Sequence, residues 1–196
     1  MNSDIRICFV GDSFINGTGD ENALGWAGRL CVIAAKKNIS TTYYNLGIRR
    51  NTSQDILLRI KTELSCRLPV EVDSRIVISF GVNDTAIEDG KTRVSEQQSI
   101  SNFNHIIKII NPAYQILMVG PPPINNDAQN KRIKSLNNRI HIRAKTLGIP
   151  FIDIFSKLES DKEYKKEITD NDGAHPKSKG YEKLANIIGS SEEWWF

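Results

Sequence analysis

The chain has 196 residues, of which 39% are apolar and 25% are charged, so it can bury a core without disulfide or metal staples. Its 26 basic and 23 acidic residues are interspersed and leave a net charge of only +3, which argues against a nucleic-acid-binding protein. The apolar runs are strand-sized and far short of the ~20 residues of a transmembrane helix, which argues against an integral membrane protein.

The beginning of the chain lacks the features of a secretory signal. It contains no basic segment followed by a long apolar stretch, and it enters an apolar, β-rich run almost at once. We therefore expect a cytoplasmic protein.

Five short apolar segments alternate with stretches that carry apolar residues at three- to four-residue spacing. The expected strands are residues 5–10, 41–46, 75–80, 114–119 and 149–154. The expected helices are residues 24–37, 53–64, 95–110, 128–147 and 178–188. This alternation predicts a parallel sheet with helices on both faces. We expect a single domain over residues 1–196, ending in an aromatic tail at 190–196.

In open α/β sheets a ligand binds beyond the carboxyl ends of the strands, so the residues that end each strand are candidates. The first strand ends in Gly11-Asp12-Ser13, where Ser13 can expose a hydroxyl beside backbone N–H groups or can simply cap a helix. Gly17 and Gly19 follow, but their spacing fits neither a P-loop nor a dinucleotide-binding loop.

The second and third expected strands end in hydrogen-bond donors. Gly47 can turn its N–H toward the crevice, or it can be an ordinary turn glycine. Asn83 carries a neutral amide donor that suits a developing oxyanion, although it can also form an Asn-Asp turn with Asp84.

A carboxylate and an imidazole, Asp172 and His175, stand three residues apart near the end of the chain. In a one-turn geometry, the carboxylate can accept the Nδ1–H of His175 and fix its tautomer. The Nε2 atom is then free to face Ser13. A serine, an aspartate and a histidine in this order are one valid arrangement of a hydrolytic triad.

Together these motifs resemble the SGNH hydrolases, also called the GDSL lipase/esterase family. Its four blocks are matched in order by Gly11-Asp12-Ser13-Phe14, Gly47, Gly81-Val82-Asn83-Asp84 and Asp172-Gly173-Ala174-His175. Two positions depart from the family pattern. Phe14 replaces the usual leucine, and Arg50-Asn51 stands where many members have a glycine.

The resemblance implies an α/β, flavodoxin-like three-layer α/β/α fold with a five-stranded parallel sheet of order 2-1-3-4-5 and helices on both faces. It also implies that Ser13 is the nucleophile, with His175 and Asp172 as its triad partners. The implied oxyanion hole consists of the N–H groups of Ser13 and Gly47 and the side chain of Asn83. The family uses no cofactor and no metal.

The expected function is hydrolysis of a small-molecule carboxylic ester, with a short acyl or acetyl group, through an acyl-enzyme. An acyltransferase, and a lysophospholipase or thioesterase, are alternatives that use the same triad. Two non-enzymatic alternatives are a flavodoxin-like nucleotide-binding module and a degenerate hydrolase that serves as a scaffold. The first leaves the Asp172–His175 pair unexplained, and the second leaves all the catalytic residue types unexplained.

Other residues are candidates for supporting roles. Asp12 and Asp84 adjoin Ser13 and Asn83, and Trp26 and Pro121 are candidate pocket walls, although Trp26 can equally be a core aromatic. The exposed-looking tail Trp194-Trp195-Phe196 must pack somewhere. It either folds back on its own domain or docks on a second subunit, in which case the chain forms a homodimer through the tail.

Overall fold

The computed structural model describes residues 4–196 and is built around a five-stranded parallel sheet. The strands are β1 (Ile5–Gly11), β2 (Thr41–Gly47), β3 (Asp73–Ser79), β6 (Gln115–Val119) and β7 (Phe151–Ile152). Their order across the sheet is β2-β1-β3-β6-β7, so the predicted order 2-1-3-4-5 is confirmed. An additional hairpin of β4 (Ile87–Glu88) and β5 (Lys91–Thr92), which was not among the expected strands, lies in the polar stretch after β3.

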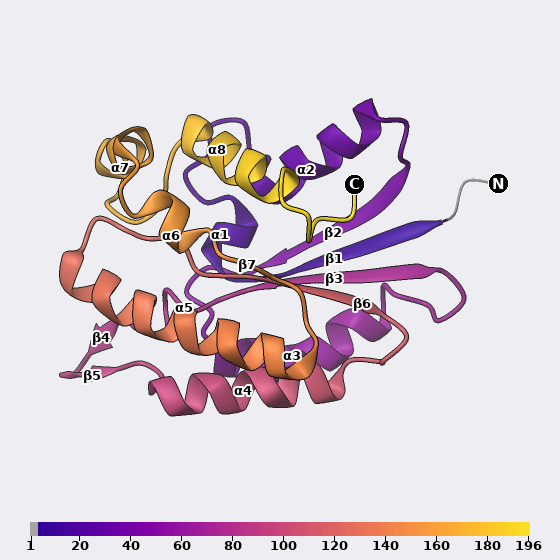
Figure 1. Cartoon of the computed structure of the whole chain (residues 1–196), viewed down its shortest axis with the longest axis horizontal. Coiled ribbons are helices and arrows are strands. Elements are labelled where there is room, and N and C mark those ends of the chain that lie inside the picture. Colours follow the sequence, from indigo (N-terminus) through magenta and orange to yellow (C-terminus); the bar gives the residue numbers. More distant parts are fainter. Residues whose placement is uncertain (1–3) are drawn as a thin grey trace.

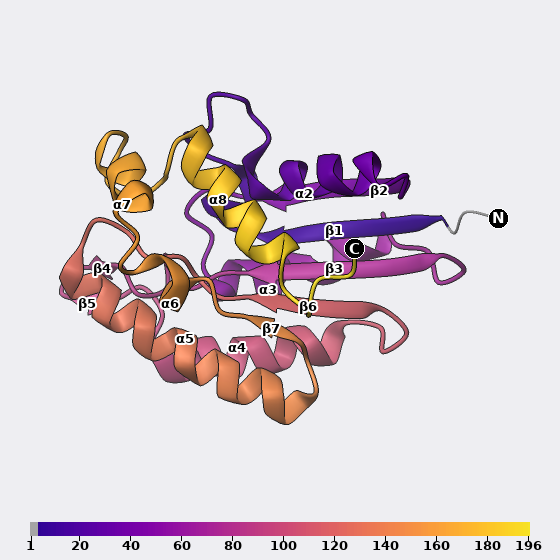
Figure 2. The same cartoon turned by 45° about the horizontal axis from the view of Figure 1, so that its top comes forward.

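Helices cover both faces of the sheet, as expected (Figures 1 and 2). One face carries α2 (Gly25–Lys36) and α8 (Ser178–Gly189), and the other carries α3 (Ser53–Ser65), α4 (Glu96–Ile109) and α5 (Asp127–Leu147). Three shorter helices were not expected: α1 (Ser13–Asn16), α6 (Phe155–Leu158) and α7 (Lys162–Thr169). Within residues 4–196, no helix has both the length and the apolar character needed to cross a bilayer.

The last strand is much shorter than the predicted segment 149–154. Only Phe151 and Ile152 are in strand conformation, paired with the end of β6. Pro150 precedes them and has no N–H to donate, although its carbonyl accepts from the backbone of Met118. The strand therefore pairs over two residues at the edge of the sheet.

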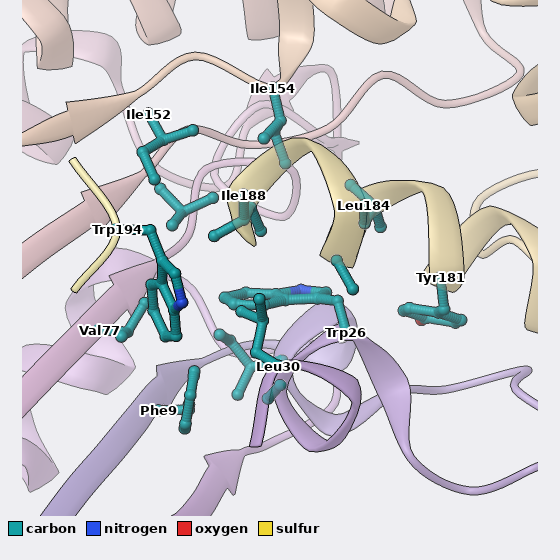
Figure 3. Close-up of a cluster of buried hydrophobic side chains, with 14 of the residues drawn as sticks. Phe9, Trp26, Leu30, Val77, Ile152, Ile154, Tyr181, Leu184, Ile188 and Trp194 are labelled. Atoms are coloured by element: carbon teal, nitrogen blue, oxygen red, sulfur yellow. The ribbon is translucent and has the colours of Figure 1, made fainter. Parts of the chain in front are cut away.

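The core between the sheet and the α2/α8 layer is rich in aromatic residues (Figure 3). Trp26 is 1% exposed and meets the Phe9 ring edge-on, with 5.7 Å between ring centroids. The prediction that Trp26 lines a pocket is therefore wrong, because its side chain is enclosed between α2, α8 and the sheet.

The aromatic tail folds back on its own domain. Trp194 is buried in the same core as Trp26, near Phe9 and Val77 (Figure 3). Trp195 and Phe196 are partly buried and lie against the Arg75 guanidinium, 5.3 and 4.8 Å from its central carbon to the ring centroids. These contacts account for the tail within one chain, and dimerisation through it stays an untested prediction.

The sheet brings the candidate residues to one edge. Gly11, at the end of β1, pairs in register with Gly47 of β2 and Ser79 of β3. Since parallel strands end at the same edge, the segments that follow them converge there. Residue 11 must be small, because a Cβ atom on Gly11 would lie 2.1 Å from the carbonyl oxygen of Ser79.

Candidate active site

Ser13 lies at the first position of α1, directly after β1. Asp12 caps this short helix by accepting a hydrogen bond from the Phe14 N–H at 2.9 Å, and Gly17 ends it in the left-handed conformation, with φ of 83°. Ser13 is only 4% exposed. The strand end and the cap together fix the position of its hydroxyl.

Asp172 and His175 form a compact turn beside Ser13. One carboxylate oxygen of Asp172 accepts from the backbone N–H groups of Ala174 and His175, at 2.9 and 2.7 Å. The other lies 2.7 Å from Nδ1 of His175, and Nε2 of the same ring lies 2.7 Å from the Ser13 hydroxyl oxygen. The structure therefore joins three predicted residues, from opposite ends of the chain, in one hydrogen-bonded line.

The carboxyl group of Asp172 favours its ionised form. Partial burial opposes its charge, but the hydrogen bonds from the backbone and ring of His175 and from the backbone of Ala174 outweigh this effect. The pKa of Asp172 is therefore lowered from its usual value. An ionised carboxylate at this position can hold the Nδ1 proton of the imidazole and stabilise an imidazolium.

The ring of Phe14 packs on His175, with ring centroids 4.9 Å apart. Phe14 belongs to a small buried cluster with Val82, Ile133 and Phe155. The phenyl group at the position where relatives usually carry leucine thus supports one face of the imidazole.

Asn83 lies in the loop after β3, and its side chain contacts Asp12, the residue before Ser13. Its side-chain nitrogen lies 3.0 Å from the carbonyl oxygen of Asn51 and 3.4 Å from a carboxylate oxygen of Asp12. The Asp12 contact is the longer of the two, so it is the easier one for a substrate oxygen to replace.

The next residue, Asp84, anchors this loop to the helices that pack against it. It is fully buried and accepts hydrogen bonds from the backbone and hydroxyl of Ser53, the first residue of α3, and from the hydroxyl of Ser99 in α4 at 2.7 Å. Asn102 in turn donates to the Ser53 hydroxyl at 2.9 Å. Asp84 therefore ties the Asn83 loop to two helices.

Asp12 is a buried carboxyl with few donors around it. Burial raises its pKa, to about 7, and the hydrogen bond from the Phe14 N–H only partly opposes this effect, while the nearby Asp84 adds to it. Below that pH the folded protein keeps Asp12 neutral.

This difference makes stability depend on pH through Asp12. An unfolded aspartate ionises near pH ~4, so the folded state binds the extra proton between about pH 4 and 7. The contribution of Asp12 is most favourable below pH ~4 and is lost as the pH rises to about 7. The Asp12→Asn variant keeps the helix-capping oxygen but cannot ionise.

When the pH is raised from 5 to 8.5, we expect the difference in free energy of unfolding between Asp12→Asn and wild type to shift in favour of the variant by on the order of 2–4 kcal/mol. Urea denaturation of both proteins at the two pH values measures this change. An equal difference between variant and wild type at both pH values would contradict it.

The N–H of Gly47, expected in the oxyanion hole, makes another contact in this structure. Its N–H donates to the side-chain oxygen of Asn45 at 3.0 Å, so this N–H is already engaged rather than free to bind an oxyanion. The Asn45 amide also donates to the carbonyl oxygen of Ile15 in α1 at 2.8 Å. A Cβ atom at position 47 would lie 2.2 Å from the backbone nitrogen of Asn16. The glycine therefore lets β2 approach the helix that carries Ser13.

We expect Gly47→Ala to destabilise the protein by about 1–3 kcal/mol, because the new methyl group meets backbone atoms that cannot move aside. Urea denaturation measures the loss. Gly28→Ala is the matched control, since its Cβ would face the movable side chain of Leu24 at 3.3 Å. Wild-type stability of Gly47→Ala would show that α1 accommodates the methyl group.

Pro121 contacts the loop of Asn83 rather than an open pocket. It is buried, and a Cβ atom on Gly81 would lie 3.1 Å from its ring. The segment that it begins continues to Asn125, whose N–H donates to the carbonyl oxygen of Gly173 at 2.9 Å. This proline-rich loop therefore supports both the Asn83 and the Asp172–His175 segments from the side.

Two arginines at the site were not predicted. Arg50 adopts the left-handed conformation with φ of 66°, which favours glycine, and its carbonyl accepts from Arg93 at 2.9 Å. The Arg59 guanidinium donates to the carbonyl oxygens of Gly11 and Leu46, at 3.0 and 2.8 Å. The only sequence signal for either was the departure from glycine at Arg50.

Comparisons with known proteins agree with this architecture. Residues 9–183 match the model of the GDSL-like lipase/acylhydrolase family. No match was found among curated protein sequences. A lipase/acylhydrolase from Enterococcus faecalis superposes with a TM-score of 0.78 at 22% identity, covering 96% of this chain and 95% of that one. Axe2, an acetylxylan esterase from Geobacillus stearothermophilus, gives a TM-score of 0.79 at 17% identity, covering 100% and 99%.

The five-stranded parallel sheet, with its candidate residues gathered at the carboxyl edge, is the flavodoxin-like α/β/α architecture of the SGNH hydrolases. The match over residues 9–183 places this chain in the GDSL-like lipase/acylhydrolase family. It is therefore a carboxylic ester hydrolase.

Proposed function

We propose that the protein hydrolyses short-chain acyl esters by a double-displacement reaction at Ser13. The observation that carries this proposal is the line Ser13–His175–Asp172, with 2.7 Å between each pair of facing atoms. A hydroxyl, a base and an orienting carboxylate in hydrogen-bond contact are what nucleophilic catalysis requires.

In the first half-reaction, Nε2 of His175 takes the proton of Ser13 as its oxygen bonds to the ester carbonyl carbon. The carbonyl electron pair moves to oxygen, and the tetrahedral intermediate collapses as the C–O bond to the leaving alkoxide breaks. His175 returns its proton to that alkoxide. In the second half-reaction, a water gives its proton to His175 and attacks the acyl-serine, and collapse returns the proton to Ser13 and releases the acid.

The negative oxygen of the intermediate needs donors. We propose the N–H of Ser13, at the start of α1, and the side-chain amide of Asn83, which exchanges its 3.4 Å contact with Asp12 for the oxyanion. The Gly47 N–H can join them only by leaving Asn45, so its contribution is the smallest of the three.

The surroundings favour a short acyl group. Three surface cavities, with volumes of about 490, 540 and 620 Å³, are lined by residues other than the three in the triad. None of these three cavities therefore offers the triad an apolar channel for a fatty chain. Axe2, one of the similar structures, is named for removing acetyl groups from xylan.

The test is a panel of p-nitrophenyl esters from acetate to palmitate, run beside labelling with a fluorophosphonate probe and peptide mapping. We expect fast turnover of acetate and butyrate, weak turnover of palmitate, and a label on Ser13. Preference for palmitate would overturn the short-acyl assignment, and a label elsewhere would overturn the nucleophile. Added alcohols that capture the acyl group in preference to water would make the enzyme an acyltransferase.

A further inference from the structure

Helices α2 and α8 both lack a capping side chain of their own. The residues before them, Leu24 and Lys177, make no side-chain hydrogen bond to the helix that follows. Uncapped first-turn N–H groups need other acceptors. The acceptors for the N–H groups of both helices lie in one stretch of chain, residues 17–24, which we term the 17–24 loop.

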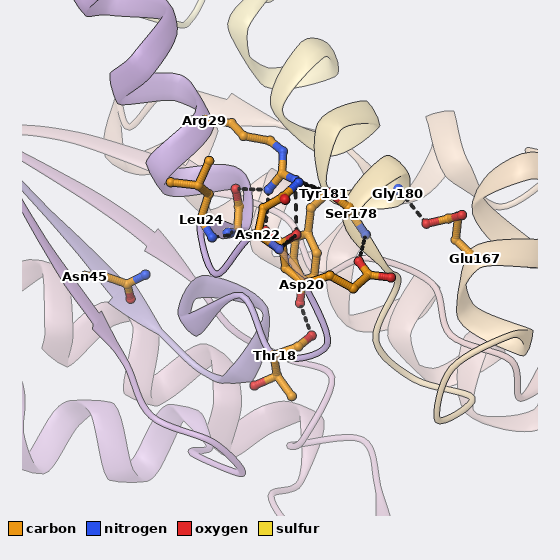
Figure 4. Close-up of polar contacts among 12 residues, drawn as sticks. Thr18, Asp20, Asn22, Leu24, Arg29, Asn45, Glu167, Ser178, Gly180 and Tyr181 are labelled. Carbon is orange, nitrogen blue, oxygen red and sulfur yellow. Dashed lines mark hydrogen bonds and ion pairs between the residues drawn. The ribbon is translucent and has the colours of Figure 1, made fainter.

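Asp20 serves α2. Its carboxylate accepts from the backbone N–H groups of Leu24 and Gly25, at 3.1 and 2.7 Å (Figure 4). Glu21 serves α8, because its carboxylate accepts from the Ser178 N–H at 2.8 Å. A negative charge at a helix N-terminus is also favoured by the helix dipole.

Arg29 links the N-terminal ends of α2 and α8. Its guanidinium pairs with Asp20 through both terminal nitrogens, and one of them also donates to the Ser178 hydroxyl at 2.7 Å (Figure 4). The Asp20 side chain is fully buried and that of Arg29 is 12% exposed. Burial opposes the charge on Asp20, but the hydrogen bonds from Arg29, Asn22 and Gly25 outweigh it and lower its pKa to about 2. The pair is therefore charged at any ordinary assay pH.

The same loop connects the two halves of the active site. It begins at Gly17, which ends the helix of Ser13, and it touches the segment of His175. A Cβ atom on Gly19 would lie 3.4 Å from the Cβ of His175. The Tyr181 hydroxyl donates to the carbonyl oxygen of Thr18 at 2.8 Å. The 17–24 loop is thus hydrogen-bonded to Ser178 and Tyr181 and lies beside His175.

We infer that Arg29, acting through Asp20 and Ser178, is a positioning residue that holds the His175 segment against Ser13. This inference rests on the proposed function, because the alignment it maintains is that of the base and the nucleophile. A base that shifts by a fraction of an ångström loses rate without losing substrate binding.

The test centres on Ser178→Ala, because removing Arg29 itself leaves a buried carboxylate unpaired and threatens the fold. Ser178→Ala removes the hydroxyl, which accepts from Arg29 and from the Asn22 side chain, and leaves the Arg29–Asp20 pair and the Glu21 contact in place. Ser178→Thr restores a hydroxyl. Ser190→Ala is the matched control, since it removes an exposed hydroxyl at the other end of α8.

Turnover is measured per active site, after titration of reactive serine with the fluorophosphonate. We expect kcat of Ser178→Ala to fall about five- to tenfold with KM within about twofold of wild type, and Ser178→Thr and Ser190→Ala to match wild type. Unchanged kcat per titrated site in Ser178→Ala would overturn the inference, because a merely structural role lowers the number of sites and not their rate.

A second readout separates this inference from the proposed function. The Nδ1 proton of His175, held against Asp172, gives a downfield proton resonance that disappears in His175→Ala. We expect it to exchange faster with water in Ser178→Ala than in wild type and Ser190→Ala. This measurement needs no turnover. A wild-type protein without esterase activity would overturn the proposed function, and the exchange rate of the Nδ1 proton would still test the positioning role. Equal exchange rates would overturn the positioning role alone.

Discussion

Replacement of Ser13 by alanine is expected to lower ester turnover about a millionfold. The variant lacks the oxygen that lies 2.7 Å from Nε2 of His175, so no covalent acyl-enzyme can form. Hydrolysis of p-nitrophenyl acetate measures the loss, and fluorophosphonate labelling of the same preparation should disappear with it.

The fold of this variant should survive. The Asp12 carboxylate that caps α1 accepts from Phe14 and not from the Ser13 hydroxyl, so the helix keeps its cap. Urea denaturation within about 1 kcal/mol of wild type is the control. Substantial turnover by a folded Ser13→Ala protein would show that another group is the nucleophile.

Asn83→Ala is expected to lower kcat by a hundred- to a thousandfold, which corresponds to about 3–4 kcal/mol of transition-state stabilisation. The amide is the one neutral side-chain donor proposed for the oxyanion, and it binds charge that appears only during the reaction. KM should therefore change little, and steady-state kinetics separates the two parameters.

Two controls accompany this variant: urea denaturation, which detects a loosened loop, and a second asparagine variant away from the site. Asn83 also donates to the carbonyl oxygen of Asn51, so its removal can loosen the chain there. Asn186→Ala, on the exposed face of α8, removes the same amide away from the site and should keep the wild-type rate. A loss confined to KM would instead place Asn83 in substrate binding.

The strands and helices could be predicted because their signals are local, whereas the strand order and the partnership of Ser13 with Asp172 and His175 were implied by the resemblance to the SGNH hydrolases. Apolar runs separated by helical periodicity give the strands, and strand-end residues in a parallel sheet share an edge. Pro150 is a local signal as well, since it has no N–H and favours a strand that begins after it.

Other assignments depend on contacts that no local pattern encodes. Trp26 is as apolar as a pocket wall would be, and only its packing between two helices and the sheet places it in the core. The sequence alone does not determine whether the N–H of Gly47 faces the crevice or the Asn45 side chain, which accepts it in the structure. Arg29 and Ser178 are far apart in sequence, and an arginine on a helix is most often just a solvated side chain.

The pairing of β1 with both β2 and β3 also bears on how the protein refolds. β1 is buried on both sides, yet each of its neighbours comes from a later and distant part of the chain. Such non-local pairing is slow to form, and until β3 pairs with it, the apolar strand β1 has an unpaired edge. Recovery from denaturant should consequently depend on protein concentration, with dilute solutions favouring the native enzyme over aggregates.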